Sequence, residues 1–143
     1  MNNLNLLAGD ISNAYLNALN HEKVHVILGP ELFGEEHQGD VAMICRALYG
    51  LKSASAVWRD HFANAIVDDL GYKACRADND VYMKAKTDKD GVEYYAYLII
   101  YVDDILSIDV NPKKVMDLIG HHFNLKDGSV EKPKMYLGSD IRE

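Results

Sequence analysis

Three aspartates stand at the ends of apolar segments. Asp103 and Asp104 are adjacent within "IIYVDDILSI", residues 99–108, and Asp10 closes the stretch "LNLLAGD". A carboxylate is costly to bury unless a hydrogen bond or an opposite charge compensates it. Clustered carboxylates bind Mg²⁺ together with substrate phosphates, and two such ions about 3.5–4 Å apart support in-line displacement at phosphorus. The three aspartates therefore predict a two-metal site for phosphoryl transfer.

The Asp103–Asp104 pair also has a simpler interpretation as a solvated turn. The flanking residues 92–102 and 105–109 are predicted strands with no Gly, Pro or Asn between them, so both aspartates are expected at the hairpin apex. Aspartate suits turns because its side chain accepts nearby backbone N–H groups. A tight hairpin turn usually contains a glycine, and its absence here favours the chemical interpretation.

Alternating strands and helices must position these acids. Strands are expected at residues 4–12, 24–28, 41–48, 80–86, 92–102, 105–109 and 134–143, and helices at 53–72 and 111–123. Residues 24–28 and 41–45 should pair antiparallel around a polar loop at 31–40, and Gly71 should end the first helix. This order predicts an α+β fold with two helices on one face of an antiparallel sheet, in a ferredoxin-like split βαβ arrangement. In that arrangement Asp10 approaches Asp103.

Length and composition predict one globular domain over residues 1–143. Hydrophobic residues make up 48% of the chain, and no apolar run approaches the roughly 20 residues of a membrane span. The start "MNNLNLLAGD" lacks the features of a secretory signal, so the chain is expected to be intracellular. Cys45 and Cys75 are expected to be reduced, buried thiols.

The charge balance limits how the chain could bind nucleic acid. Lys and Arg total 15 against 22 acidic residues, a net charge of −7. A free-standing nucleic-acid-binding protein is usually basic, because phosphate contacts supply much of the affinity. A nucleic-acid role would therefore depend on a local site or on other parts of a longer protein.

Four short segments follow one another along the chain. They are "DISNAYLNA" at 10–18, "ALYGLKSASAVW" at 47–58, "YVDD" at 101–104 and "YLGSDI" at 136–141. In this order they resemble the reverse transcriptases of copia-type LTR retrotransposons (Pseudoviridae), over nearly the whole chain. The resemblance implies the palm domain of an RNA-directed and DNA-directed DNA polymerase, without most of the fingers, the thumb and RNase H. Its partners would be dNTPs and a primer on an RNA or DNA template.

The resemblance also assigns roles at the predicted metal site. Asp10, Asp103 and Asp104 would be catalytic, and with the carbonyl of Ile11 they would hold two Mg²⁺ ions, for which Mn²⁺ can substitute. Tyr136, Leu137 and Gly138 would form the primer grip. An intact parent would act in a cytoplasmic virus-like particle.

The nucleotide-binding residues implied by the resemblance are Tyr15, Lys52 and Ser53. Tyr15 would exclude a ribonucleotide's 2′-OH, although an ordinary core aromatic is the alternative, as a surface role is for Lys52. The family usually has Gln at position 53, Pro at 55 and Arg at 56, where this chain has Ser53, Ser55 and Ala56. The shorter Ser53 weakens direct contact with a nucleotide.

Two other interpretations of the whole chain stay open. The chain could be a catalytically silent palm remnant, because the fingers and thumb are expected to be missing. It could instead be a ferredoxin-like interaction module that self-associates or binds a partner through an exposed sheet edge, such as the "YLG" strand.

Overall fold

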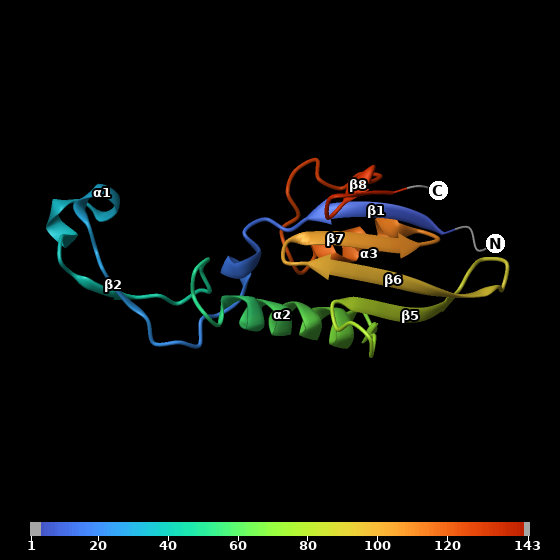
Figure 1. Ribbon diagram of the computed structural model, residues 1–143, viewed down its shortest axis with the longest axis horizontal. Helices are drawn as coiled ribbons and strands as arrows, with labels where there is room; N and C mark the ends of the chain where they lie inside the picture. Colours follow the sequence, from blue (N-terminus) through green and yellow to red (C-terminus); the bar gives the residue numbers. More distant parts are fainter. Residues whose placement is uncertain (1–3, 142–143) are drawn as a thin grey trace. The chain divides into compact units, whose positions relative to one another are not determined.

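The computed structural model describes residues 4–141 (Figure 1). The chain divides into two compact units. The first unit contains the residues up to Asn13 and those from Phe62 onward, and the second runs from Ala14 to His61.

A five-stranded antiparallel sheet forms the centre of the first unit. Its strands are β1 (Asn5–Asp10), β4 (Lys73–Ala74), β5 (Val81–Thr87), β6 (Glu93–Tyr101) and β7 (Asp104–Asp109). They lie in the order β1-β7-β6-β5-β4, so β7 is inserted between β1 and β6 (Figure 1). The predicted α+β class with an antiparallel sheet is confirmed.

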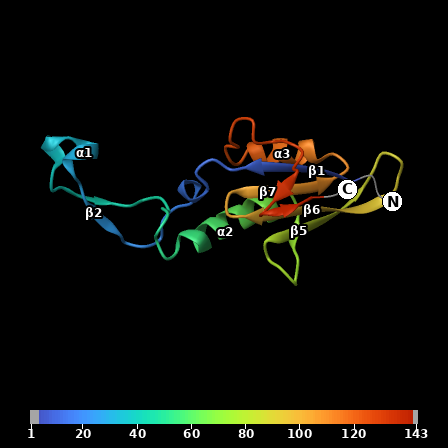
Figure 2. The same cartoon turned by 45° about the horizontal axis from the view of Figure 1, so that its top comes forward.

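One face of this sheet is buried. Along β6 the buried side chains alternate, as a half-buried strand requires, and they are Tyr94, Ala96, Leu98 and Ile100. Helix α3 (Pro112–Gly120) packs against β1 and β7 (Figure 2). It begins where the Asn111 side chain accepts a hydrogen bond from the Lys114 N–H at 3.2 Å, with Pro112 in its first turn.

The predicted helix at 53–72 is present as two consecutive segments. Helix α2 (Ala54–Asn64) continues as a π-helical turn, η3 (Ala65–Asp69), in which the Leu70 N–H reaches the Ala65 carbonyl at 3.3 Å. Gly71 follows with φ +70° and ends the helix as predicted. At the C-terminal end of α2, Phe62 lies 5.5 Å from the Phe123 ring and 6.1 Å from the Tyr82 ring, which joins the helix to the core.

The second unit contains a small hairpin of strands β2 (His25–Ile27) and β3 (Val41–Met43), paired antiparallel as predicted. It also includes the 3₁₀ turn η1 (Ala14–Asn17). The loop predicted at 31–40 joins β2 and β3, and it contains helix α1 (Pro30–Phe33) and the 3₁₀ turn η2 (Glu35–His37), which the sequence analysis does not predict. Pro30 favours the first turn of a helix, and Gly34 at φ +81° ends it.

The C-terminal segment differs from the single strand expected at 134–143. Strands β8 (Met135–Tyr136) and β9 (Ser139–Asp140) form their own hairpin, and positions 142–143 lie outside the described residues. Leu137 and Gly138 have φ values of +47° and +78°, the signs of a type I′ turn. Because β8 pairs with β9, "YLG" is the end of β8 and its hairpin turn, and it does not form an edge of the main sheet.

The cysteine prediction is partly wrong. Both thiols are free, but Cys45 is exposed and Cys75 is half-buried. The apolar residues before Cys45 belong to the β2–β3 hairpin, where Ile27, Val41 and Met43 are themselves exposed. Within residues 4–141, no helix has both the length and the apolar character needed to cross a membrane.

Candidate active site

The β6–β7 hairpin turns through Val102 and Asp103, with Tyr101 paired to Asp104 across the turn. The prediction that both aspartates lie at the apex is wrong for Asp104, which is the first residue of β7. Val102 has φ +57°, whereas Asp103 does not have a positive φ, which matches the signs of a type II′ turn. A β-branched residue with positive φ is rare, and such strain is concentrated at functional sites.

Asp10 lies directly opposite Asp104 across the β1–β7 ladder. The Ile11 N–H extends this ladder by donating to the Asp103 carbonyl at 2.8 Å. Directly opposed residues in an antiparallel pair have Cβ atoms about 4.5–5.5 Å apart. Residues far apart in sequence thus bring the three predicted aspartates together at one end of the sheet.

Electrostatic repulsion is present in this cluster. Burial raises the pKa of the Asp104 carboxyl above its usual range, and the negative charges of Asp103 and Asp10 raise it further. Neighbouring carboxylates cannot all stay ionised at low energy without a compensating cation. The site therefore has the electrostatic character of a cation site.

We expect Asp104→Asn to stabilise the fold at pH 7 in the absence of divalent ions. A raised pKa means that ionised Asp104 destabilises the folded state, so the variant's gain should shrink as the pH falls through the raised folded pKa and should vanish below the unfolded pKa of about 3.9. The gain should be a few tenths to about 1 kcal/mol, the range for opposed like charges on neighbouring strands. Chemical denaturation at pH 7 and pH 3.5 measures it, with the exposed Asp127→Asn as control. A loss of stability at pH 7 would contradict the repulsion.

A C-terminal turn fixes the backbone of Asp10. The Asp10 N–H donates to Ser129 Oγ at 3.1 Å, and the Lys126 N–H donates to the Asp10 carbonyl at 2.8 Å. The Lys126 ammonium lies 3.6 Å from the Asp10 carboxylate. Sequence reasoning missed these three contacts, because "KDGS" indicates a turn but does not identify what the turn contacts.

Tyr136, predicted in the primer grip, reaches the same site. Its hydroxyl donates to the Asp104 carbonyl at 3.4 Å, and Leu137 and Gly138 form the turn that follows it. Burial, with the nearby Asp104 charge, raises the pKa of Tyr136 to about 12. The tyrosine thus stays a neutral hydrogen-bond donor at physiological pH.

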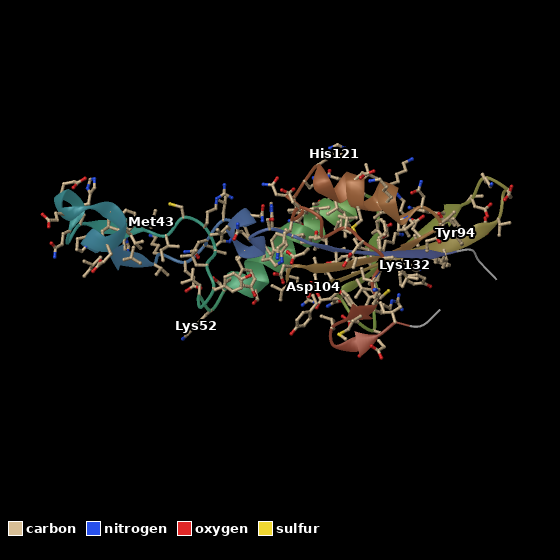
Figure 3. The ribbon with its side chains drawn as sticks, turned by 90° about the horizontal axis from the view of Figure 1, so that it is seen from above. Met43, Lys52, Tyr94, Asp104, His121 and Lys132 are labelled. Atoms are coloured by element: carbon tan, nitrogen blue, oxygen red, sulfur yellow. The ribbon has the colours of Figure 1, made fainter. Side chains whose placement is uncertain are left out.

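A cleft of about 380 Å³ opens beside the two opposed aspartates. Asp10 and Asp104 line it together with Lys132, Lys134 and Met135, and Figure 3 labels Asp104 and Lys132. Sequence reasoning did not single out the two lysines. Their signal was the basic "KPK" at 132–134 immediately before the predicted primer grip.

A profile of the family described as "Reverse transcriptase (RNA-dependent DNA polymerase)" matches residues 2–143. The chain belongs to the reverse transcriptase family. It is 29% identical over 138 residues to the putative transposon Ty5-1 protein of Saccharomyces cerevisiae. It is also 25% and 23% identical, over 136 and 121 residues, to the retrovirus-related Pol polyproteins from transposons RE1 and RE2 of Arabidopsis thaliana.

These alignments cover most of this chain but only part of each relative. They include 94%, 93% and 82% of the chain, and 42%, 9% and 8% of the Ty5-1, RE1 and RE2 proteins. No solved structure matches. The predicted relationship to copia-type retrotransposon reverse transcriptases is confirmed.

The residues predicted to bind a nucleotide belong to the second unit. The Tyr15 ring is buried 4.5 Å from the Tyr49 ring, and its hydroxyl lies 3.0 Å from Ser55 Oγ. The Ser53 N–H donates to the Glu22 carboxylate at 2.9 Å, and Lys52 is exposed (Figure 3). Their contact with a nucleotide stays a prediction.

The donor set at this site fits a hard cation. Carboxylate oxygens are the ligands that Mg²⁺ prefers, and burial together with the negative charges of Asp103 and Asp10 raises the pKa of Asp104. Within residues 4–141, however, no three His, Cys, Asp or Glu side chains already converge on one point as a metal site. The residues are suitable, but their side chains would have to turn toward a bound ion.

Proposed function

We propose that this chain is the palm of an RNA-directed and DNA-directed DNA polymerase from a copia-type retrotransposon, which transfers deoxynucleotides from dNTPs to a primer 3′-OH. The placement of Asp10 directly opposite Asp104, beside the Asp103 turn, carries this proposal. It supports catalysis because two segments distant in the sequence bring three aspartates to one end of the sheet, where their side chains could turn toward cations. Family membership supports the same reaction.

The order of the elements supports a ferredoxin-like palm. Helix α2 lies between β1 and β6 in the chain, β7 enters the sheet between those two strands, and α3 follows β7. This is the order of a split βαβ unit. That residues 1–143 form one palm domain, without most of the fingers, the thumb and RNase H, belongs to the same proposal.

Asp10, Asp103 and Asp104, with the carbonyl of Ile11, would hold two Mg²⁺ ions, or Mn²⁺ in their place. When bound, such ions lower the pKa of an attacking hydroxyl and stabilise a leaving pyrophosphate. The hydrogen bonds that join Asp10 to Ser129 and Ile11 to the Asp103 carbonyl keep the backbone of the acids fixed. Because the backbone that carries the acids is already fixed, less conformational entropy is lost when the reacting groups are brought into position.

The other predicted residues would orient the two substrates. Tyr136, Leu137 and Gly138 would hold the primer end, and the Tyr136–Asp104 hydrogen bond supports this. Tyr15 would exclude the 2′-OH of a ribonucleotide, and Lys52 and Ser53 would contact the nucleotide. The template would be RNA or DNA, in a cytoplasmic virus-like particle within the cell.

Extension of a labelled primer tests the proposed function. A polymerase that contains this chain should extend the primer on RNA and DNA templates with dNTPs and Mg²⁺, and it should use rNTPs far less well. Synthesis by the 143-residue chain alone would also rule out the silent remnant. If the longer polymerase makes no templated product with Mg²⁺ or with Mn²⁺, the proposal is wrong.

A further inference from the structure

Lys132, Pro133 and Lys134 lie between two clefts on the first unit. The first cleft, of about 380 Å³, also contains the carboxylates of Asp10 and Asp104. The second, of about 350 Å³, is lined by the same three residues together with Leu6 and Ile141. The two lysines therefore border both spaces.

The clefts follow strand β1 from one end to the other. Asp10 is the last residue of β1 and Leu6 lies near its start, so the two clefts are spread over about 13 Å of extended chain. The segment with the lysines is fixed alongside, because Ala8 and Glu131 exchange backbone hydrogen bonds of 2.9 and 3.2 Å. Pro133 further restricts the backbone between the lysines.

Two lysines stand close together in a chain that is acidic as a whole, although Glu131, Asp10 and Asp104 also line the first cleft. The net charge of −7 repels polyanions, yet two exposed lysines stand on one wall beside the aspartates. Lysine ammonium groups on such a wall attract phosphates, whose binding releases counterions. The second cleft adds the apolar side chains of Leu6 and Ile141, against which sugars or bases can pack.

We propose that Lys132 and Lys134 bind consecutive phosphates of a nucleic-acid strand that runs along β1 toward Asp10 and Asp104. The identification of this strand as the primer rests on the proposed function. A dNTP or pyrophosphate offers the same phosphate chemistry. The strand is favoured because two successive clefts along β1 form a longer path than one triphosphate group fills.

The test is the salt dependence of binding to the full chain. Fluorescence anisotropy of a labelled oligonucleotide duplex with a recessed 3′ end gives the binding constant between 25 and 200 mM salt, roughly the range over which phosphate contacts are resolved. In the double variant Lys132→Gln, Lys134→Gln, the slope of log K against log [salt] should become less steep by about 1.5–2, because two phosphate contacts are lost.

The matched control is the double variant Lys89→Gln, Lys113→Gln. It removes the same charge from the β5–β6 turn and from α3, where Lys113 is exposed and pairs with Asp117 at 3.2 Å. This control should retain the original slope. If both double variants change the slope equally, or if the unmodified chain does not bind the duplex at all, the inference is overturned.

Competition with inorganic pyrophosphate separates the two sources of phosphate. If the Lys132→Gln, Lys134→Gln variant loses pyrophosphate binding but keeps the duplex slope, the lysines bind the nucleotide and the strand assignment is wrong.

Binding of the duplex and synthesis of DNA are measured separately. A lysine-dependent slope without DNA synthesis would refute only the proposed function, whereas synthesis with an unchanged slope would refute only this inference.

Discussion

Replacing Asp103 with asparagine is expected to reduce templated DNA synthesis by about 10³-fold while leaving the fold intact. The change removes one negative charge and almost no volume. The backbone hydrogen bond from Ile11 to the Asp103 carbonyl does not depend on the side chain, so the β1–β7 register should persist. Loss of a single electrostatic group at a reacting centre typically has effects of this order, about 10²–10³-fold.

The assay is single-turnover primer extension by a polymerase that contains this chain. Asp90→Asn, in the turn between β5 and β6, is the matched control because it removes the same charge away from the site, and its rate should be unchanged. Circular dichroism confirms that both variants fold. Synthesis by Asp103→Asn within about threefold of the parent would exclude Asp103 as a metal ligand, since a lost ligand acts far more strongly.

The second large effect concerns stability, at the opposite end of β7. The buried carboxylate of Asp109 pairs with Lys86 and accepts hydrogen bonds from the Tyr94 hydroxyl at 3.0 Å and the Asn111 N–H at 2.9 Å. Asp109→Ala should lower the free energy of unfolding by about 3 kcal/mol, the lower end of the range for a buried pair, because the change leaves the buried Tyr94 hydroxyl and the half-buried Lys86 ammonium without their partner. Urea denaturation at pH 7 measures this loss.

The pH dependence gives a further check on Asp109. Burial alone would raise the pKa of its carboxyl, but hydrogen bonds from Lys86 and Asn111 and the Lys86 charge outweigh burial and hold the pKa below its usual range. A lowered pKa contributes stability above the unfolded value of about 3.9, and this contribution is lost as the pH falls through the folded value. The Asp109→Ala variant should therefore lack that part of the acid sensitivity.

A matched control for Asp109 is Asp117→Ala. Asp117 is exposed and pairs with the exposed Lys113 at 3.2 Å, and such surface pairs contribute about 0–1 kcal/mol. If Asp109→Ala costs no more than Asp117→Ala, the buried network does not stabilise the first unit.

The regular parts of the fold follow from local pattern. Strand β6 shows the predicted alternation of buried apolar residues, one helix ends at Gly71, and helix α3 begins at Pro112. Each of these features depends only on residues that are close together in the sequence, so each can be predicted from it. The turn of the main hairpin was misplaced by one residue because Val102 adopts a positive φ that β-branched residues rarely take. The helix α1 was missed because its four residues, Pro30–Phe33, are too short for a periodic signal.

The candidate site was only partly predictable for a different reason. Topology alone brings Asp10 toward the late hairpin, since β1 and β7 are neighbours in a split βαβ sheet. The contacts of the aspartates join segments that are far apart in the sequence. Ser129 and Lys126 contact Asp10, and Ser129 follows it by 119 residues. Tyr136 contacts Asp104 and follows it by 32 residues. No local pattern in a single sequence specifies such pairings.

We expect Asp10, Asp103 and Asp104 together to bind divalent metal ions. Titration of this chain with Mg²⁺, and with paramagnetic Mn²⁺, followed by amide NMR, measures this binding. Mg²⁺ should cause shifts, and Mn²⁺ line broadening, that are confined to residues around these aspartates and lost in Asp103→Asn. An absence of any localised change, or the same change in Asp103→Asn, would contradict this expectation.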